Sequence, residues 1–61
     1  MTQEEAKKCM IEQIVSMKQS GRRTTRDMEM EITGMMIAFH KMNVFADDEY
    51  LKVLESMLNL V

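Results

Sequence analysis

The chain contains one cysteine, Cys9, and one histidine, His40, the side chains best suited to nucleophilic or acid–base chemistry. A catalytic nucleophile needs a base and a donor that stabilises developing negative charge. No carboxylate lies at helical spacing from His40, and Lys7 and Lys8 precede Cys9 without sharing its helical face. We therefore expect Cys9 in the core or at its boundary, and His40 on the surface near a helix end. The sequence also lacks a phosphate loop, a dinucleotide fingerprint and metal-ligand spacing, so we predict a non-enzymatic protein without cofactor, metal or small-molecule substrate.

Four of the eight basic residues fall within nine positions and form what we call the basic turn: Lys18, Arg22, Arg23 and Arg26. Such a cluster could contact phosphate or carboxylate groups, on nucleic acid or on an acidic protein surface. It could equally be a solvated loop in which Lys18 and Arg22 offset the negative end of a helix. The acidic run Asp47–Glu49 could pair with the basic turn, within one chain or between copies, or simply favour the start of its own helix.

Nucleic acid is the weaker choice of partner. The net charge is -2 and the sequence pI is near 5.2, whereas a general nucleic-acid coat carries a basic excess. A helix-turn-helix interpretation is also disfavoured, because Asp47 and Asp48 would lead one reading helix and Asp27 follows Arg26 in the other. Carboxylates at these positions would repel phosphates.

Sixty-one residues can form one small domain, predicted over 1–61, and a single cysteine excludes an internal disulfide. The longest run without charge or strong polarity, Gly34–Phe39, has six residues, against about 20 for a membrane span. The segment Met1–Glu5 is acidic and polar, unlike a secretory signal. We expect a soluble, cytoplasmic protein with no membrane partner.

Helix-capping signals divide the chain into three predicted helices, over about 3–20, 25–42 and 47–60. The expected N-caps are Thr2, Thr24 and Asp47, with Thr25 as the alternative to Thr24. Thr2 is the strongest of these, because Glu5 follows it at the spacing of a capping box. Gly21 and Asn43 tolerate the left-handed conformation and are the expected stops of the first two helices.

Apolar residues recur every three or four positions in each predicted helix, which gathers them on one face. The three stripes are Ala6, Met10, Ile14 and Met17; Met28, Ile32, Met35, Phe39 and Met42; and Tyr50, Leu54, Met57 and Val61. Met36 flanks the second stripe, and Leu51 and Leu58 broaden the third. No segment alternates with the period of a strand. We predict an all-α, three-helix bundle.

The apolar residues exceed what one small bundle needs, and six of them form the expected partner or dimer interface: Met30, Gly34, Ile37, Ala38, Val53 and Leu60. Gly34 and Ala38 leave a notch where another backbone could approach. Because small helical chains often complete their core by oligomerising, we expect a homodimer; the alternative is that these residues pad a monomer. The nine methionines either fill the core or form a face that adapts to a partner.

The leading functional hypothesis is a small helical protein–protein interaction module that acts as a regulator, inhibitor or adaptor. It would bind a second copy of itself, another protein, or both. The alternative hypothesis is a nucleic-acid-associated regulator that uses the basic turn.

Overall fold

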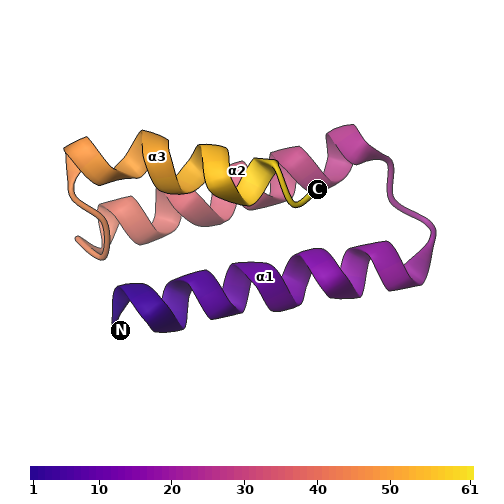
Figure 1. Ribbon diagram of the computed structural model, residues 1–61, viewed down its shortest axis with the longest axis horizontal. Coiled ribbons are helices and arrows are strands. Elements are labelled where there is room, and N and C mark those ends of the chain that lie inside the picture. Colours follow the sequence, from indigo (N-terminus) through magenta and orange to yellow (C-terminus); the bar gives the residue numbers. More distant parts are fainter.

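The computed structural model describes all 61 residues and contains three α-helices and no strand (Figure 1). Helices α1, α2 and α3 span Gln3–Ser20, Thr25–Lys41 and Asp47–Leu58. The predicted all-α three-helix fold is confirmed. The predicted helix boundaries are correct to within two residues, because most of them depend on local capping groups that the sequence displays directly.

Threonines cap the starts of α1 and α2, as predicted. The Thr2 hydroxyl accepts the Glu5 backbone N–H at 3.1 Å, and the Glu5 carboxylate accepts the Thr2 backbone N–H at 3.0 Å, which completes the capping box. The bond from the Thr2 backbone is the main reason why the pKa of Glu5 lies below its usual value. The Thr24 hydroxyl accepts the Asp27 backbone N–H at 3.1 Å in the same way.

Gly21 ends α1 in the left-handed conformation, with φ of 65°, and its N–H donates to the Lys18 carbonyl at 3.3 Å. The Ser20 hydroxyl donates to the Met17 carbonyl at 2.8 Å and accepts the Arg22 N–H at 3.3 Å. The hydroxyl thereby links the Met17 carbonyl to the Arg22 N–H, two groups that hydrogen-bond each other directly in a full Schellman motif. The predicted glycine stop is confirmed.

The second predicted stop, Asn43, forms a Schellman motif at the end of α2. It has a φ of 61° and is the one non-glycine residue with a positive φ. The Asn43 N–H donates to the His40 carbonyl, and the Val44 N–H donates to the Phe39 carbonyl, each at 3.0 Å. The chain therefore leaves α2 in a fixed direction and turns back toward it.

The predicted N-cap of α3, Asp47, is wrong. The capping position belongs to Ala46, which has no side-chain oxygen to accept an N–H, and Asp47 is the first helical residue. The Asp47 carboxylate instead hydrogen-bonds the His40 ring at the end of α2. The acids of the first turn still lie at the positive end of the helix dipole. The helix ends at Leu58, two residues before the predicted end, and the chain closes in tighter turns.

The three helices enclose one continuous core of 11 buried side chains, and α2 packs against both of its neighbours. The core consists of Ala6, Met10, Ile14, Met17, Met28, Ile32, Met36, Phe39, Phe45, Val53 and Met57. Phe45, in the α2–α3 turn, is almost completely buried and meets the Phe39 ring edge-on, with centroids 6.4 Å apart. The turn is thus held by apolar packing as well as by backbone bonds.

The buried stripe of α2 differs from the predicted one. Met36 is fully buried, whereas Met35 is half-buried and Met42, past the helix end, is 60% exposed. The predicted stripe alternated steps of four and three, an average of 3.5 residues per turn, and such a stripe drifts around a straight helix. Helix α2 packs against both α1 and α3, and it buries the residues that face these two neighbours. Met36 is one of those residues.

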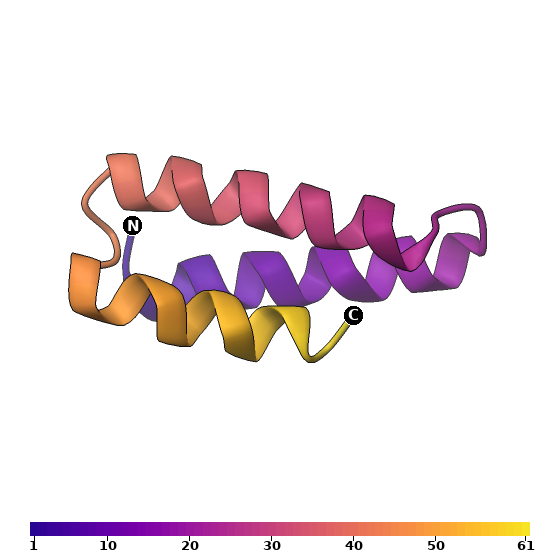
Figure 2. The same cartoon turned by 90° about the horizontal axis from the view of Figure 1, so that it is seen from above.

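Helix α2 runs antiparallel to α1, and α3 runs back along α2, so that the molecule measures 32 × 18 × 16 Å (Figures 1 and 2). The basic turn lies at one end, and the α2–α3 turn lies at the other, beside the N-terminus (Figure 2). A bond of 3.2 Å from the Gln3 amide to the Glu49 carboxylate joins the starts of α1 and α3. None of the three helices combines the length and apolar content that a membrane crossing requires.

Candidate functional site: the exposed face of helix α2

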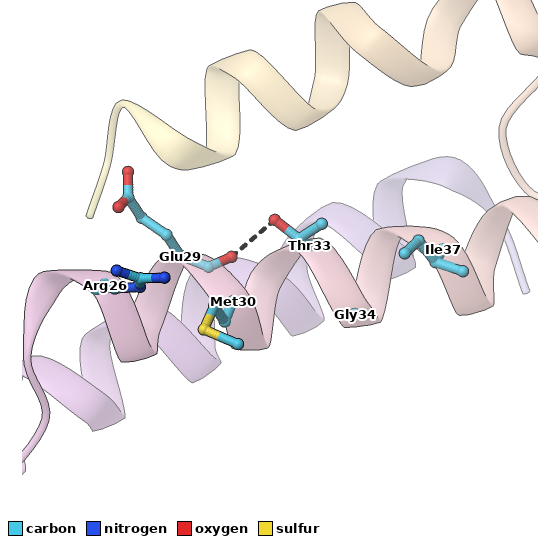
Figure 3. A pocket seen from close by; sticks show the side chains of 6 residues that line it. All are labelled: Arg26, Glu29, Met30, Thr33, Gly34 and Ile37. Carbon is cyan, nitrogen blue, oxygen red and sulfur yellow. Dashed lines mark hydrogen bonds between the residues drawn. The ribbon is translucent and has the colours of Figure 1, made fainter.

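A shallow hollow lies on the exposed side of α2, and we call its six lining residues the α2 face: Arg26, Glu29, Met30, Thr33, Gly34 and Ile37 (Figure 3). Met30 is 64% exposed and Ile37 is 43% exposed. They lie on either side of Gly34 along the helix, at spacings of four and three residues. The α2 face is therefore an apolar strip with polar residues beside it.

Helix periodicity explains why this face is solvent-exposed. Successive residues turn by about 100°, so Met30 and Ile37 point away from the side on which Met28, Ile32 and Met36 are buried. The Thr33 hydroxyl donates to the Glu29 carbonyl at 2.8 Å, so it needs no partner from outside (Figure 3). The face thus presents two large apolar side chains, a hydroxyl that is bonded within the helix, and the charged side chains of Arg26 and Glu29.

Gly34 has no role inside the chain that would explain its presence in a helix. A Cβ built on it would find no atom within 4 Å, and its φ lies outside the left-handed region. A glycine in a helix interior costs about 1 kcal/mol relative to alanine. The open space and the missing Cβ leave room for a second backbone to approach closely at this position.

The structure places the six predicted interface residues in three different environments. Met30, Gly34 and Ile37 come together on the α2 face, and Ala38 is exposed one turn beyond Gly34. Leu60 is exposed but lies in the turn after α3, outside the hollow. The prediction for Val53 is wrong, because this side chain is 9% exposed and belongs to the core.

A second apolar patch, which was not predicted from the sequence, lies on α3. Leu51, Leu54 and Leu58 line another shallow hollow together with Glu55 and Asn59. These leucines were expected to belong to the core stripe, yet Leu51 is 69% exposed. The width of the apolar band on α3 was visible in the sequence, but the side of the band that stays exposed was not, and Leu51 lies on that side.

The basic turn is exposed at all four of its positions. One guanidinium nitrogen of Arg23 lies 3.8 Å from the Glu31 carboxylate, a loose ion pair, and Arg26 belongs to the α2 face. Two backbone N–H groups near the start of α2 are not free to bind an anion, because Thr24 accepts hydrogen bonds from the N–H groups of Asp27 and Met28. The basic turn is thus a set of separate side chains and not a formed anion pocket.

His40 has a carboxylate partner that helical spacing could not reveal. Its Nε2 lies 2.5 Å from the Asp47 carboxylate, and its ring centroid lies 4.9 Å from that of Tyr50. The pair joins the end of α2 to the start of α3 across the turn. The expected position of Cys9 is wrong, since Cys9 is exposed on α1. The structure brings together no group of three or more His, Cys, Asp or Glu side chains that could hold a metal ion.

Compared with protein-family models, with curated proteins and with solved structures, this chain matches none of them.

Proposed function

We propose that the chain is a small, non-enzymatic protein-interaction module that binds through the α2 face and pairs there with a second copy of itself. Through this face it would serve as a regulator, inhibitor or adaptor. The observation that carries the proposal is the exposure of Met30 and Ile37 beside Gly34, on a helix whose opposite side already forms the core.

The core supports the proposal because it is complete without the α2 face. Eleven side chains are buried in the single chain, and no buried side-chain nitrogen or oxygen lacks a hydrogen-bond partner. Met30 and Ile37 lie outside this core. A long, flexible methionine beside a glycine notch suits contact with another protein surface, and Arg26 and Glu29 supply the polar surroundings of such a contact.

A double substitution tests the face directly. Met30→Glu with Ile37→Glu should weaken self-association more than about tenfold, because it places carboxylates in the contact. Helicity should be unchanged, because both side chains are exposed within the single chain. Association would be measured by sedimentation equilibrium, and helicity by circular dichroism.

The matched control is Ile11→Glu with Val15→Glu, two exposed apolar residues one turn apart on α1. The control should leave association unchanged. If the control variant is monomeric and the α2 variant still associates, the interface lies on α1 and not on α2. Loss of helicity in the α2 variant would mean that Met30 and Ile37 support the fold, and a wild-type protein that stays monomeric at millimolar concentration would end the homodimer proposal.

The alternative function, contact with nucleic acid, draws support from the exposed cations of the basic turn. Three or four phosphate contacts per subunit would give a log–log salt dependence with a slope of about -3. Replacing Arg22, Arg23 and Arg26 with alanine should then abolish binding. No retention of DNA or RNA at about 50 mM salt would remove this alternative.

A further inference from the structure

Two opposite charges lie at equal distances from Gly34 along α2. Asp27 precedes Gly34 by seven residues and Lys41 follows it by seven. Seven residues are close to two helical turns, so all three lie along nearly the same side of the helix. Both charged side chains are exposed, and neither forms an ion pair within the chain, whereas Arg23 and His40 do.

This symmetry has a geometric consequence for two copies of α2. If two identical helices pack antiparallel around a two-fold axis at Gly34, each residue before Gly34 faces the residue equally far after it on the other copy. Asp27 of each copy then lies beside Lys41 of the other. Met30 lies beside Ala38 of the other copy, which sets a long side chain against a small one.

We propose that a second copy of this chain binds the α2 face in an antiparallel orientation, with the two-fold axis at Gly34 and an Asp27–Lys41 ion pair on each side of it. The inference rests on the proposed function, since it specifies how the homodimer is arranged. Gly34 lets the two backbones approach at the axis because no Cβ separates them.

Charge complementarity decides between the two orientations. A parallel pair would set Asp27 against Asp27 and Lys41 against Lys41, and it would bring the two basic turns together. Within one chain, the α1–α2 turn and the start of α3 lie at opposite ends (Figure 2). An antiparallel pair would therefore set the basic turn of each copy at the end where the other copy carries the exposed Asp47 and Asp48. Like charges placed together oppose a pairing, and opposite charges fix its orientation.

The size of the face sets the expected affinity. A standard interface buries about 800 Å² on each partner. That would be nearly a fifth of the 4316 Å² of accessible surface of this chain, whereas the α2 face offers only two large apolar side chains, Met30 and Ile37. We therefore expect a dissociation constant of roughly 1–100 μM, and ion pairs that contribute more to orientation than to affinity.

Charge exchange tests the orientation. Asp27→Lys alone, or Lys41→Asp alone, should weaken the dimer by about tenfold at low salt, because each replaces two attractions with two repulsions. The double variant D27K/K41D restores both pairs and should return to within about threefold of the wild type. Raising the salt to about 0.5 M should shrink all these differences. The matched controls Glu4→Lys and Lys8→Asp make the same charge changes at exposed positions of α1 and should leave the dissociation constant unchanged.

Cross-linking tests the same arrangement directly, with Cys9→Ser as the background. Asp27→Cys mixed with Lys41→Cys should give a cross-linked pair with a short thiol reagent, and Asp27→Cys alone should not. Efficient cross-linking of Asp27→Cys with itself, or a dimer indifferent to D27K, would overturn the antiparallel arrangement while leaving the proposed homodimer intact. A wild-type chain that never dimerises would overturn both.

Discussion

Gly34→Ala should change the stability of the folded chain and the stability of the dimer in opposite directions. Within one chain, the added methyl group meets no atom within 4 Å, and the glycine occupies the interior of α2. Alanine is favoured over glycine in a helix interior by about 1 kcal/mol. For a domain of this size, that gain raises Tm by about 4–8 °C. The chain should therefore become more stable.

The proposed dimer should become weaker, because the new methyl group would sit on its two-fold axis, where the two backbones would approach most closely. Overpacking of this kind costs about 1–2 kcal/mol, which is roughly a 5–30-fold increase in Kd. Urea unfolding well below the Kd measures the first effect, and sedimentation equilibrium measures the second. Gly21→Ala is the matched control, because Gly21 has a φ of 65°, where alanine is strained, and this variant should destabilise the chain.

Two results would refute this reasoning in different places. If Gly34→Ala destabilises the chain, the description of open space around Gly34 is wrong, and this glycine packs against other parts of its own chain. If Gly34→Ala stabilises the chain and leaves the Kd unchanged or lower, the two copies do not meet at Gly34. The dimer axis would then have to lie elsewhere, and the patch formed by Leu51, Leu54 and Leu58 would be the next surface to test.

Two further predictions concern the fold that holds the α2 face. Phe45→Ala should lower the free energy of unfolding by about 3–5 kcal/mol, which is much of the stability of a 61-residue chain. Circular dichroism should then show a cooperative loss of helicity. Leu51→Ala, at an exposed position, should lower the free energy of unfolding by less than about 1 kcal/mol. The pKa of Glu5 is lowered by its capping bonds, so the stability that its carboxylate contributes is present above the usual pKa of 4.5 and is lost as the pH falls below it. Glu5→Gln should thus be less stable than the wild type at neutral pH, and the difference measured by urea unfolding should shrink toward pH 3; a constant difference would mean that the capping box has no electrostatic component.

The features that were predictable from sequence are those fixed by neighbouring residues. A threonine three residues before a glutamate, a glycine at a helix end and an asparagine at another each determine a local backbone geometry with little help from the rest of the chain. The structure has the expected bonds at Thr2, Thr24, Gly21 and Asn43. The prediction of Asp47 as an N-cap was wrong because an acid at a helix start can be either the cap or the first helical residue. Its contact with His40 depends on the path of the α2–α3 turn, which local sequence does not determine.

The rotation of each helix about its axis was less predictable. On α3 the apolar residues cover so much of the circumference that the sequence does not decide between Val53 and Leu51 as the buried one. Packing against the other helices decides it, and Val53 becomes core while Leu51 is exposed. The burial of Phe45 was not predicted, because this residue lies in a turn, where helical periodicity gives no signal. It is nevertheless among the most buried residues of the chain.

The methionines show why composition alone could not identify the candidate site. Five of the nine are buried core residues: Met10, Met17, Met28, Met36 and Met57. Their abundance therefore mainly reflects a core built from flexible side chains that fill irregular space. Of the exposed ones, Met1 lies at the chain start and Met42 follows the end of α2. Met30 alone lies within a helix, opposite the core and one turn from Gly34, and this position, not its residue type, makes it a candidate contact residue.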